Sequence, residues 1–158
     1  MRVLSGTARG VPLKTVPDFH TRPILDRVKK SLFSILESST LIQDAMVADL
    51  YAGTGTQGIE ALSRGAETCL FVEKRPDAVA LLNENLAKTR LAAKADVRCD
   101  TVMRVLQALG GGSEPGARFD LILYDPPFSF SREQAHRCRT VTTACNARGV
   151  VQQSVSPA

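Results

Sequence analysis

Four consecutive residues, Asp125-Pro126-Pro127-Phe128, form the segment of this chain best suited to chemistry. An exocyclic amine on a planar base is a poor nucleophile, because its lone pair is delocalised into the ring. A catalyst must accept hydrogen bonds from that amine, which Asp125 and the Pro126 carbonyl can do. The prolines restrict the loop, and the ring of Phe128 offers a face for stacking. These four residues are the predicted catalytic group, although such a short match on its own is more often a rigid turn.

A glycine-rich segment, DLYAGTGTQG at residues 49–58, follows the start of an apolar run. Small residues in such a turn let the backbone approach a bound ligand closely, which predicts a nucleotide-like cofactor. Glu73 ends the next apolar run about 20 residues beyond Gly53, the offset at which an acid meets ribose hydroxyls. The alternative is a tight turn that serves only the packing of helix on strand.

The spacing fits NAD as well as S-adenosylmethionine. Asp49 lies four residues ahead of Gly53, where its carboxylate could face an amino-acid ammonium, and the turn has no pyrophosphate to hold. S-adenosylmethionine is therefore the predicted cofactor. Asp100 could accept a hydrogen bond from the adenine amino group or cap the helix that starts at Thr101, and both interpretations stay open. The predicted cofactor-binding residues are Asp49, Ala52, Gly53, Thr54, Gly55, Gly58, Glu73, Lys74 and Asp100.

Short apolar runs alternate with helical patterns from residue 46 onward, which is typical of a parallel sheet with crossover helices. The expected strands are 46–51, 68–73, a weaker 95–99, and 119–124, with helices at about 57–64, from 76, and 101–109. The predicted fold is α/β and Rossmann-like. The glycine turn and the DPPF loop each follow a strand, so both should lie at the carboxyl edge of the sheet, where ligands bind.

The first 30 residues are basic. Residues 1–16 predict a short hairpin or extended arm, followed by a helix over 24–37 whose apolar positions face the sheet and whose Arg27, Lys29 and Lys30 point outward. Phosphate contacts from this region would position a nucleic acid without choosing a base. A solvated face explains the charge equally well. The predicted RNA-binding residues are Arg2, Arg9, Lys14, Arg22 and Arg27.

Composition indicates one globular domain of 158 residues with a net charge of +4. No run approaches the roughly 20 apolar residues of a membrane span, and the N-terminus has no apolar signal core, so a cytoplasmic protein is expected. The four cysteines lack CxxC spacing, so neither a metal site nor a disulfide framework is expected. Cys69 and Cys99 lie in strand-like runs and are expected to be buried. The expected state is a monomer.

After Phe130 the strand and helix patterns fail, apart from a brief GVV run. The expected division is a basic arm at 1–20, a Rossmann-like domain at 21–130 and an atypical tail of disordered composition at 131–158. The sheet is expected to end after its fourth strand, which would leave one edge of that strand uncovered.

Five segments, MRVLSGTARGVPL, TRPILDRVKKSLFSIL, DLYAGTGTQGIEALSRGA, FVEKRPDA and DPPF, together resemble the bacterial RsmD-type 16S ribosomal RNA guanine-N2 methyltransferases. The resemblance runs from residue 1 to about 130. It implies a Rossmann-like methyltransferase that uses S-adenosylmethionine on the exocyclic N2 amine of a guanine in small-subunit ribosomal RNA. It also implies cofactor contacts at Asp49, Gly53, Gly55, Glu73 and Asp100, catalysis at residues 125–128, and Arg22 and Asp26-Arg27 at the border of the active site.

The tail departs from that family, whose members continue past the DPPF loop with a helix and three more strands. Residues 131–158 are typical of a truncated or out-of-frame end. Three alternatives therefore stay open. One is an amino-methyltransferase for other nucleic acids or proteins, which would use the same loop. Another is an inactive, truncated RNA-binding remnant, and the last is an NAD-dependent oxidoreductase, which gains nothing from DPPF.

Overall fold

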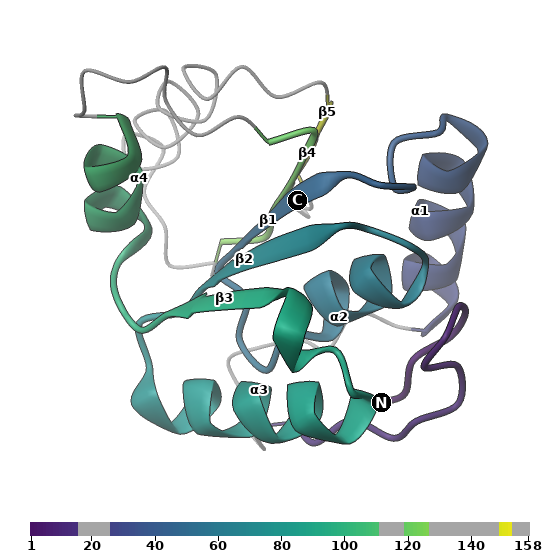
Figure 1. The fold of residues 1–158 in the computed structure, drawn as a ribbon, viewed down its shortest axis with the longest axis horizontal. Coiled ribbons are helices and arrows are strands. Elements are labelled where there is room, and N and C mark those ends of the chain that lie inside the picture. The colour runs from purple at the N-terminus through teal and green to yellow at the C-terminus, as the bar shows by residue number, and fades with distance from the viewer. Residues whose placement is uncertain (16–25, 111–118, 127–148, 153–158) are drawn as a thin grey trace, which may run out of the picture.

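A parallel sheet forms the centre of the molecule in the computed structural model, which describes residues 1–15, 26–110, 119–126 and 149–152 (Figure 1). Five strands lie in the order β3-β2-β1-β4-β5, and every neighbouring pair is parallel. The strands are β1 (Met46–Leu50), β2 (Thr68–Val72), β3 (Ala95–Arg98), β4 (Leu121–Tyr124) and β5 (Gly149–Gln152). The helices are α1 (Asp26–Ser38), α2 (Thr56–Ser63), α3 (Pro76–Thr89) and α4 (Val102–Gly110), with the short η1 (Ala92–Lys94). The predicted α/β, Rossmann-like class is confirmed.

The central strands are largely apolar because both faces of the sheet are covered. One core cluster joins the sheet to α1, α2 and α3 through side chains such as Phe33, Ile59 and Leu82. The other cluster, which includes Leu106 and Ile122, joins the opposite face to α4. Figure 1 shows α4 apart from the other helices, on the far side of the sheet. The sheet therefore fixes where each connecting loop emerges.

The helix over residues 26–38 buries a different face from the one expected. Lys29, predicted to point outward, is fully buried, whereas the apolar Val28 and Ile35 are 50% and 63% exposed. Phe33 and Leu36 complete the buried stripe with Lys29 at helical spacing. The outward placement of Lys29 is thus wrong, because the buried carboxylate of Glu60 on α2 provides a partner for its ammonium.

Two other expectations are changed by the edges of the sheet. Cys69 is buried as expected, but Cys99 is exposed, since it follows β3, the outermost strand on its side. At the other side, the structure adds a fifth strand, β5, which pairs with β4 from Leu121↔Gly149 to Tyr124↔Gln152. The GVV run was too short to be counted as a strand from sequence, and pairing with β4 decides its conformation. This strand covers the edge of β4 that was expected to be open.

The N-terminal residues form the short hairpin that the sequence predicts. Arg2 and Pro12 make an antiparallel bridge, Val3 donates to the Val11 carbonyl at 3.1 Å, and Gly10 donates to the Val3 carbonyl at 2.9 Å. The hairpin packs on the end of α2, where the Thr7 amide donates to the Ser63 carbonyl at 2.8 Å. Within the described ranges, no helix has the length and apolar character to cross a membrane.

Candidate active site

The glycine turn and Asp125 emerge at the same edge of the sheet. They follow β1 and β4, which are adjacent parallel strands with Asp49 opposite Leu123 and Leu50 opposite Tyr124. Tyr51, directly after β1, and Tyr124, the last residue of β4, pack their rings edge to face with centroids 5.6 Å apart. The structure therefore brings the predicted cofactor turn beside the first two residues of the predicted catalytic loop. Pro127 and Phe128 lie outside the described residues.

The turn after β1 has a backbone that favours glycine. Gly53 and Gly55 have φ values of 56° and 79°, and Tyr51 also lies in the left-handed region, at 67°. A Cβ built on Gly53 would meet none of the described residues within 4 Å, whereas one on Gly55 would lie 2.1 Å from Leu82 Cδ1. Gly55 and Gly58 are thus required by packing inside the protein. Gly53 instead borders open space in which a ligand can approach the backbone.

Asp49 is buried at the start of this turn, with 2% of its surface exposed. Its Oδ2 accepts a hydrogen bond from the Gly58 amide at 2.8 Å, which ties β1 to the first residues of α2. Burial, together with the negative charges of Asp125 and Glu73, raises the pKa of Asp49 to about 7, although the hydrogen bond from Gly58 acts in the opposite direction. Three carboxylates therefore gather at this edge, and a positively charged ligand would relieve their repulsion.

Glu73 follows β2 and is held from both sides by backbone amides. Its Oε2 accepts from Gly53 and its Oε1 from Arg75, each at 2.9 Å. A carboxylate oxygen can accept more than one hydrogen bond, so capacity remains for hydroxyl donors such as those of a ribose. The contact also fixes Glu73 directly against the glycine turn, as expected for an acid that shares a ligand with that turn.

Asp125 has a neighbour that sequence analysis missed. Gln57, in the first turn of α2, donates from Nε2 to Asp125 Oδ2 over 3.5 Å. Burial raises the pKa of Asp125 to about 6. Gln57 was seen only as the start of a helix; the available signal was its place within the glycine turn, where the first helical turn faces the sheet edge.

Three further predicted cofactor residues, at positions 52, 74 and 100, follow the first three strands of the chain. Ala52 donates to the Val72 carbonyl at 2.9 Å, so it fixes the turn to β2, and Lys74 is exposed just beyond Glu73. Asp100 follows β3 and accepts a hydrogen bond from the Thr101 amide at 2.7 Å. Thr101 Oγ1 in turn accepts a hydrogen bond from the Arg104 amide of α4 at 3.4 Å. The adenine contact of Asp100 stays a prediction beside this local bonding.

A second residue that sequence analysis missed, Asn85 of α3, joins the turn to the N-terminal hairpin. Its side chain is fully buried. Oδ1 accepts from the Lys14 amide at 2.8 Å, and Nδ2 donates to the Lys14 carbonyl at 2.9 Å and to the Thr54 carbonyl at 3.0 Å. Asparagine within an amphipathic helix carries little signal, because its partners come from distant parts of the chain. The structure thus fixes Thr54 and Lys14 to the same side chain.

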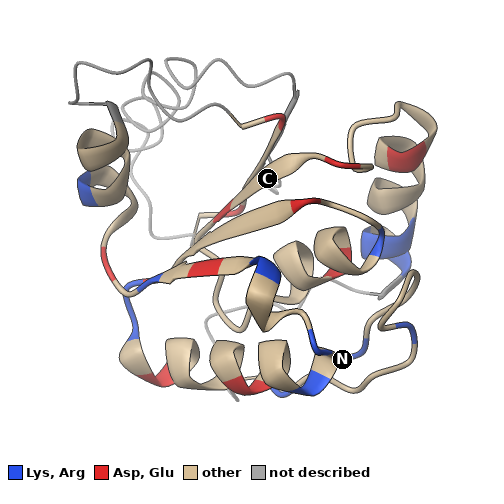
Figure 2. Cartoon of the chain, viewed as in Figure 1, with Lys and Arg blue, Asp and Glu red and all other residues tan. Residues whose placement is uncertain are grey.

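The predicted RNA-binding residues have different surroundings in the structure. Lys14 pairs with Glu84 on α3, and Arg22 lies outside the described residues. Arg2, Arg9 and Arg27 instead line one groove between the hairpin and α1. Basic residues gather on these two elements in Figure 2. The expectation that Arg22 and Asp26-Arg27 border the active site stays a prediction.

Comparison with known proteins assigns the family. The model of a family described as Conserved hypothetical protein 95 matches residues 1–153. The chain belongs to this family. A Bacillus subtilis relative named "Putative rRNA methyltransferase YlbH" is 38% identical over 85% of this chain and 71% of the relative. The Haemophilus influenzae ribosomal RNA small subunit methyltransferase D is 32% identical over 85% of this chain and 68% of the relative.

The solved structures agree with that assignment. A hypothetical protein from Thermus thermophilus superposes with a TM-score of 0.78 and 31% identity, over 93% of this chain and 80% of the other. The expected enzyme class is confirmed: this family member is a methyltransferase. The site fits S-adenosylmethionine, the expected cofactor, since the open space at Gly53 admits a ligand and the three carboxylates suit one that carries a positive charge.

Proposed function

We propose that this protein methylates ribosomal RNA, and that its target is the exocyclic N2 amine of a guanine in the 16S RNA of the small ribosomal subunit. The observation that carries the proposal is the placement of Asp125, directly after β4, beside the glycine turn that follows β1. The names of the Bacillus and Haemophilus relatives support RNA as the substrate class. A nucleic-acid amine is also the nucleophile that the DPPF loop suits best.

One group of site residues holds the cofactor, and another binds the amine that is methylated. S-adenosylmethionine supplies a methyl group on a positively charged sulfur. Asp49 and Glu73 hold its charged and hydroxyl groups, while the backbone at Gly53 leaves the space that the ligand needs. Asp125 accepts a hydrogen bond from the amine and so localises its lone pair on nitrogen. The Pro126 carbonyl is a second acceptor, and Phe128 stacks on the base.

The target guanine must be unpaired or flipped out of its helix, because a stacked base cannot reach the sheet edge. Flipping costs roughly a few kcal/mol, which contacts elsewhere on the RNA must offset. We also propose that the protein acts as a monomer in the cytoplasm, where ribosomal RNA is available. Size-exclusion chromatography and cell fractionation test these two points, and a stable dimer or a membrane-bound pool would contradict them.

The decisive experiment offers the protein and S-adenosylmethionine four acceptors: free 16S RNA, small ribosomal subunits, DNA and bulk protein. Nucleoside mass spectrometry should find N2-methylguanosine in the RNA or the subunits only. Asp125→Ala should abolish transfer, with a loss of about 100-fold or more, while calorimetry finds cofactor binding nearly intact. Methylation of DNA or protein alone would favour an amino-methyltransferase of another class. A folded protein that binds RNA but methylates nothing would be the inactive remnant.

A further inference from the structure

A groove of about 670 Å³ lies between the N-terminal hairpin and α1, beside the end of α2. It is far larger than one phosphate ion needs, and eight of its eleven lining residues are polar or charged. We call it the basic groove. Its lining residues are Arg2, Val3, Leu4, Ser5, Arg9, Gly10, Arg27, Lys30, Ser34, Glu37 and Arg64.

Charge in the basic groove is strongly one-sided. Glu37 is its one acidic lining residue, and its carboxylate pairs with Arg64 at 2.8 Å. Four cationic side chains remain, all exposed, and the structure shows no carboxylate paired with them among the residues it describes. These four are Arg2, Arg9, Arg27 and Lys30. A surface of this kind attracts an anion with several charges.

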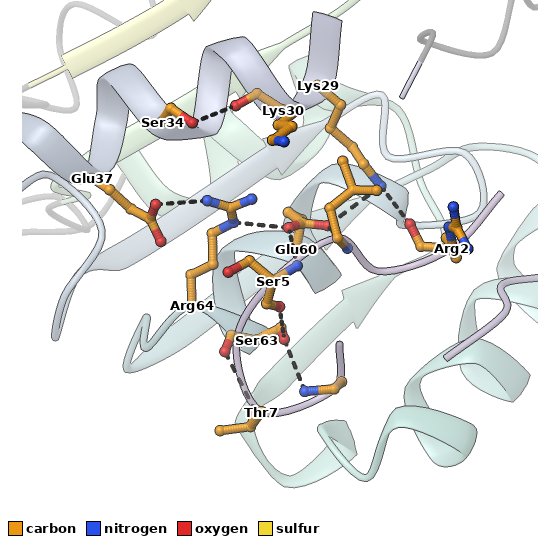
Figure 3. A network of polar contacts seen from close by, with 12 residues as sticks. Arg2, Ser5, Thr7, Lys29, Lys30, Ser34, Glu37, Glu60, Ser63 and Arg64 are labelled. Atoms are coloured by element: carbon orange, nitrogen blue, oxygen red, sulfur yellow. Dashed lines mark hydrogen bonds and ion pairs between the residues drawn. The ribbon is translucent and has the colours of Figure 1, made fainter. Parts of the chain in front are cut away.

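A buried network holds the floor of the basic groove in place (Figure 3). Glu60 of α2 accepts the Leu4 and Ser5 amides at 2.8 and 3.1 Å, and it also accepts from Arg64 Nε at 2.8 Å. Lys29 Nζ lies 3.4 Å from the same carboxylate. The hairpin, α1 and α2 thus share one set of buried charges.

The same network fixes the hairpin backbone at Arg2. Lys29 Nζ donates to the Arg2 carbonyl at 3.0 Å, so α1 holds the strand that carries this exposed arginine. Ser63 Oγ adds a hydrogen bond to the Ser5 carbonyl at 2.6 Å. The hairpin backbone that carries cations of the groove is therefore held in place, which lowers the conformational entropy lost when a ligand binds.

The basic groove lies toward the edge of the sheet where the strands begin. Arg64 follows the last residue of α2, and α2 starts at the glycine turn on the carboxyl edge. The eight residues of α2 separate Arg64 from the glycine turn by about 12 Å. Beside Arg64, the Gly65 carbonyl accepts from the Asp44 amide just before β1. The Arg64 end of the groove is therefore separated by the length of α2 from the glycine turn, beside which Asp125 lies.

We propose that the basic groove binds the sugar-phosphate backbone of the RNA at a point remote from the methylated base. The inference rests on the proposed function, which supplies RNA as the anionic partner. Guanidinium groups match phosphate oxygens in pairs, and three of the four exposed cations are arginines. A substrate must then extend past the target nucleotide by at least the length of α2. A short oligonucleotide that carries only the target guanine cannot reach both places.

The test compares two double variants, each of which removes two exposed positive charges. Arg9→Gln with Lys30→Gln alters the basic groove, while Lys88→Gln with Arg90→Gln alters the far end of α3 as the matched control. Both pairs are exposed, so melting temperatures should stay close to that of the unaltered protein. KM and kcat are measured with full-length 16S RNA and with a short target oligonucleotide, and RNA affinity is measured directly at several salt concentrations.

The groove variant should raise KM for 16S RNA on the order of tenfold, with little change in kcat. The slope of log affinity against log salt should become shallower by about 0.7 to 0.9 for each phosphate that the protein no longer neutralises. KM for the short oligonucleotide should not respond. Equal effects of the two variants, or none, would overturn the groove proposal even if methylation is observed. Absence of methylation by the unaltered protein would overturn the proposed function instead. The RNA affinities measured at several salt concentrations would then still test the groove proposal.

Discussion

Gln57 Nε2 and Asp125 Oδ2 lie 3.5 Å apart, so the first turn of α2 contacts the residue that directly follows β4. An amide donor favours the ionised form of a carboxylate, whereas burial favours the protonated form. Burial prevails here, and it raises the pKa of Asp125 to about 6. The protein thus keeps the proposed acceptor ionised at neutral pH by a small margin.

The rate of methyl transfer should fall as the pH drops through about 6, because a protonated Asp125 no longer offers a full carboxylate to the amine. Gln57→Leu removes the donor and should move this fall to higher pH. Rate–pH profiles at saturating cofactor measure the shift. Gln57→Asn, which keeps an amide, is the control, and identical profiles for the Leu variant and the unaltered protein would count against a positioning role for Gln57.

Cofactor binding should strengthen as the pH rises through about 7, because binding a positively charged ligand favours ionised Asp49. The stability of the fold changes with pH in the opposite direction and falls as the pH rises. The raised pKa means that the native state holds a proton that the unfolded chain releases near pH 4, so stability is lost between about pH 4 and 7, by about 4 kcal/mol at most. Calorimetric titration and urea unfolding across this range should show both trends.

Asp49→Asn serves as the control for both measurements, since an amide does not titrate. It should flatten the pH dependence of cofactor affinity and of unfolding. A pH dependence that survives in the Asn variant would assign the effect to another group at the site, such as Asp125.

Gly53→Ala and Gly55→Ala should separate ligand binding from folding. Both positions have positive φ, which costs alanine about 1 kcal/mol. At Gly53 the new methyl has no atom of the described part of the chain within 4 Å and enters the space of the ligand, so cofactor affinity should fall with little further loss of stability. At Gly55 the methyl collides with Leu82, which adds about 1–3 kcal/mol of overpacking. Calorimetry and denaturant unfolding of both variants test this, and equal effects on binding and stability would contradict it.

Lys29→Met should destabilise the protein by about 3 kcal/mol, because it leaves buried Glu60 with one cation fewer. The double variant with Glu60→Gln should recover part of that loss, since no unpaired charge remains. Lys88→Met on the exposed face of α3 is the control and should change stability by less than about 0.5 kcal/mol. A Lys29 variant as stable as this control would mean that the pair contributes nothing to the packing of α1 on α2.

The core of the site could be predicted from the sequence because its signals are local. A glycine turn after an apolar run, an acid at the end of the next run and a DPPF loop after another all depend on short segments, and parallel strands bring such segments to one edge. Lys29 could not be placed in this way. Its burial depends on Glu60, which is remote in sequence, so helical periodicity alone assigned the wrong face to α1.

Gln57 and Asn85 were missed for the same reason, because each has a long-range polar partner that composition does not reveal. The fifth strand was missed because four residues carry too weak a pattern, and only pairing with β4 makes them a strand. Interactions far apart in the chain thus account for the differences, while the fold class rests on local apolar runs.

The hairpin has a consequence for how the protein is made. Its residues 4–8 bond to Glu60 and Ser63, which lie 55 to 58 positions later in the chain. At synthesis rates of about 5–20 residues per second, several seconds pass before those partners exist. The hairpin residues therefore leave the ribosome well before their partners, and a nascent chain that stalls before α2 has nothing on which to dock its hairpin.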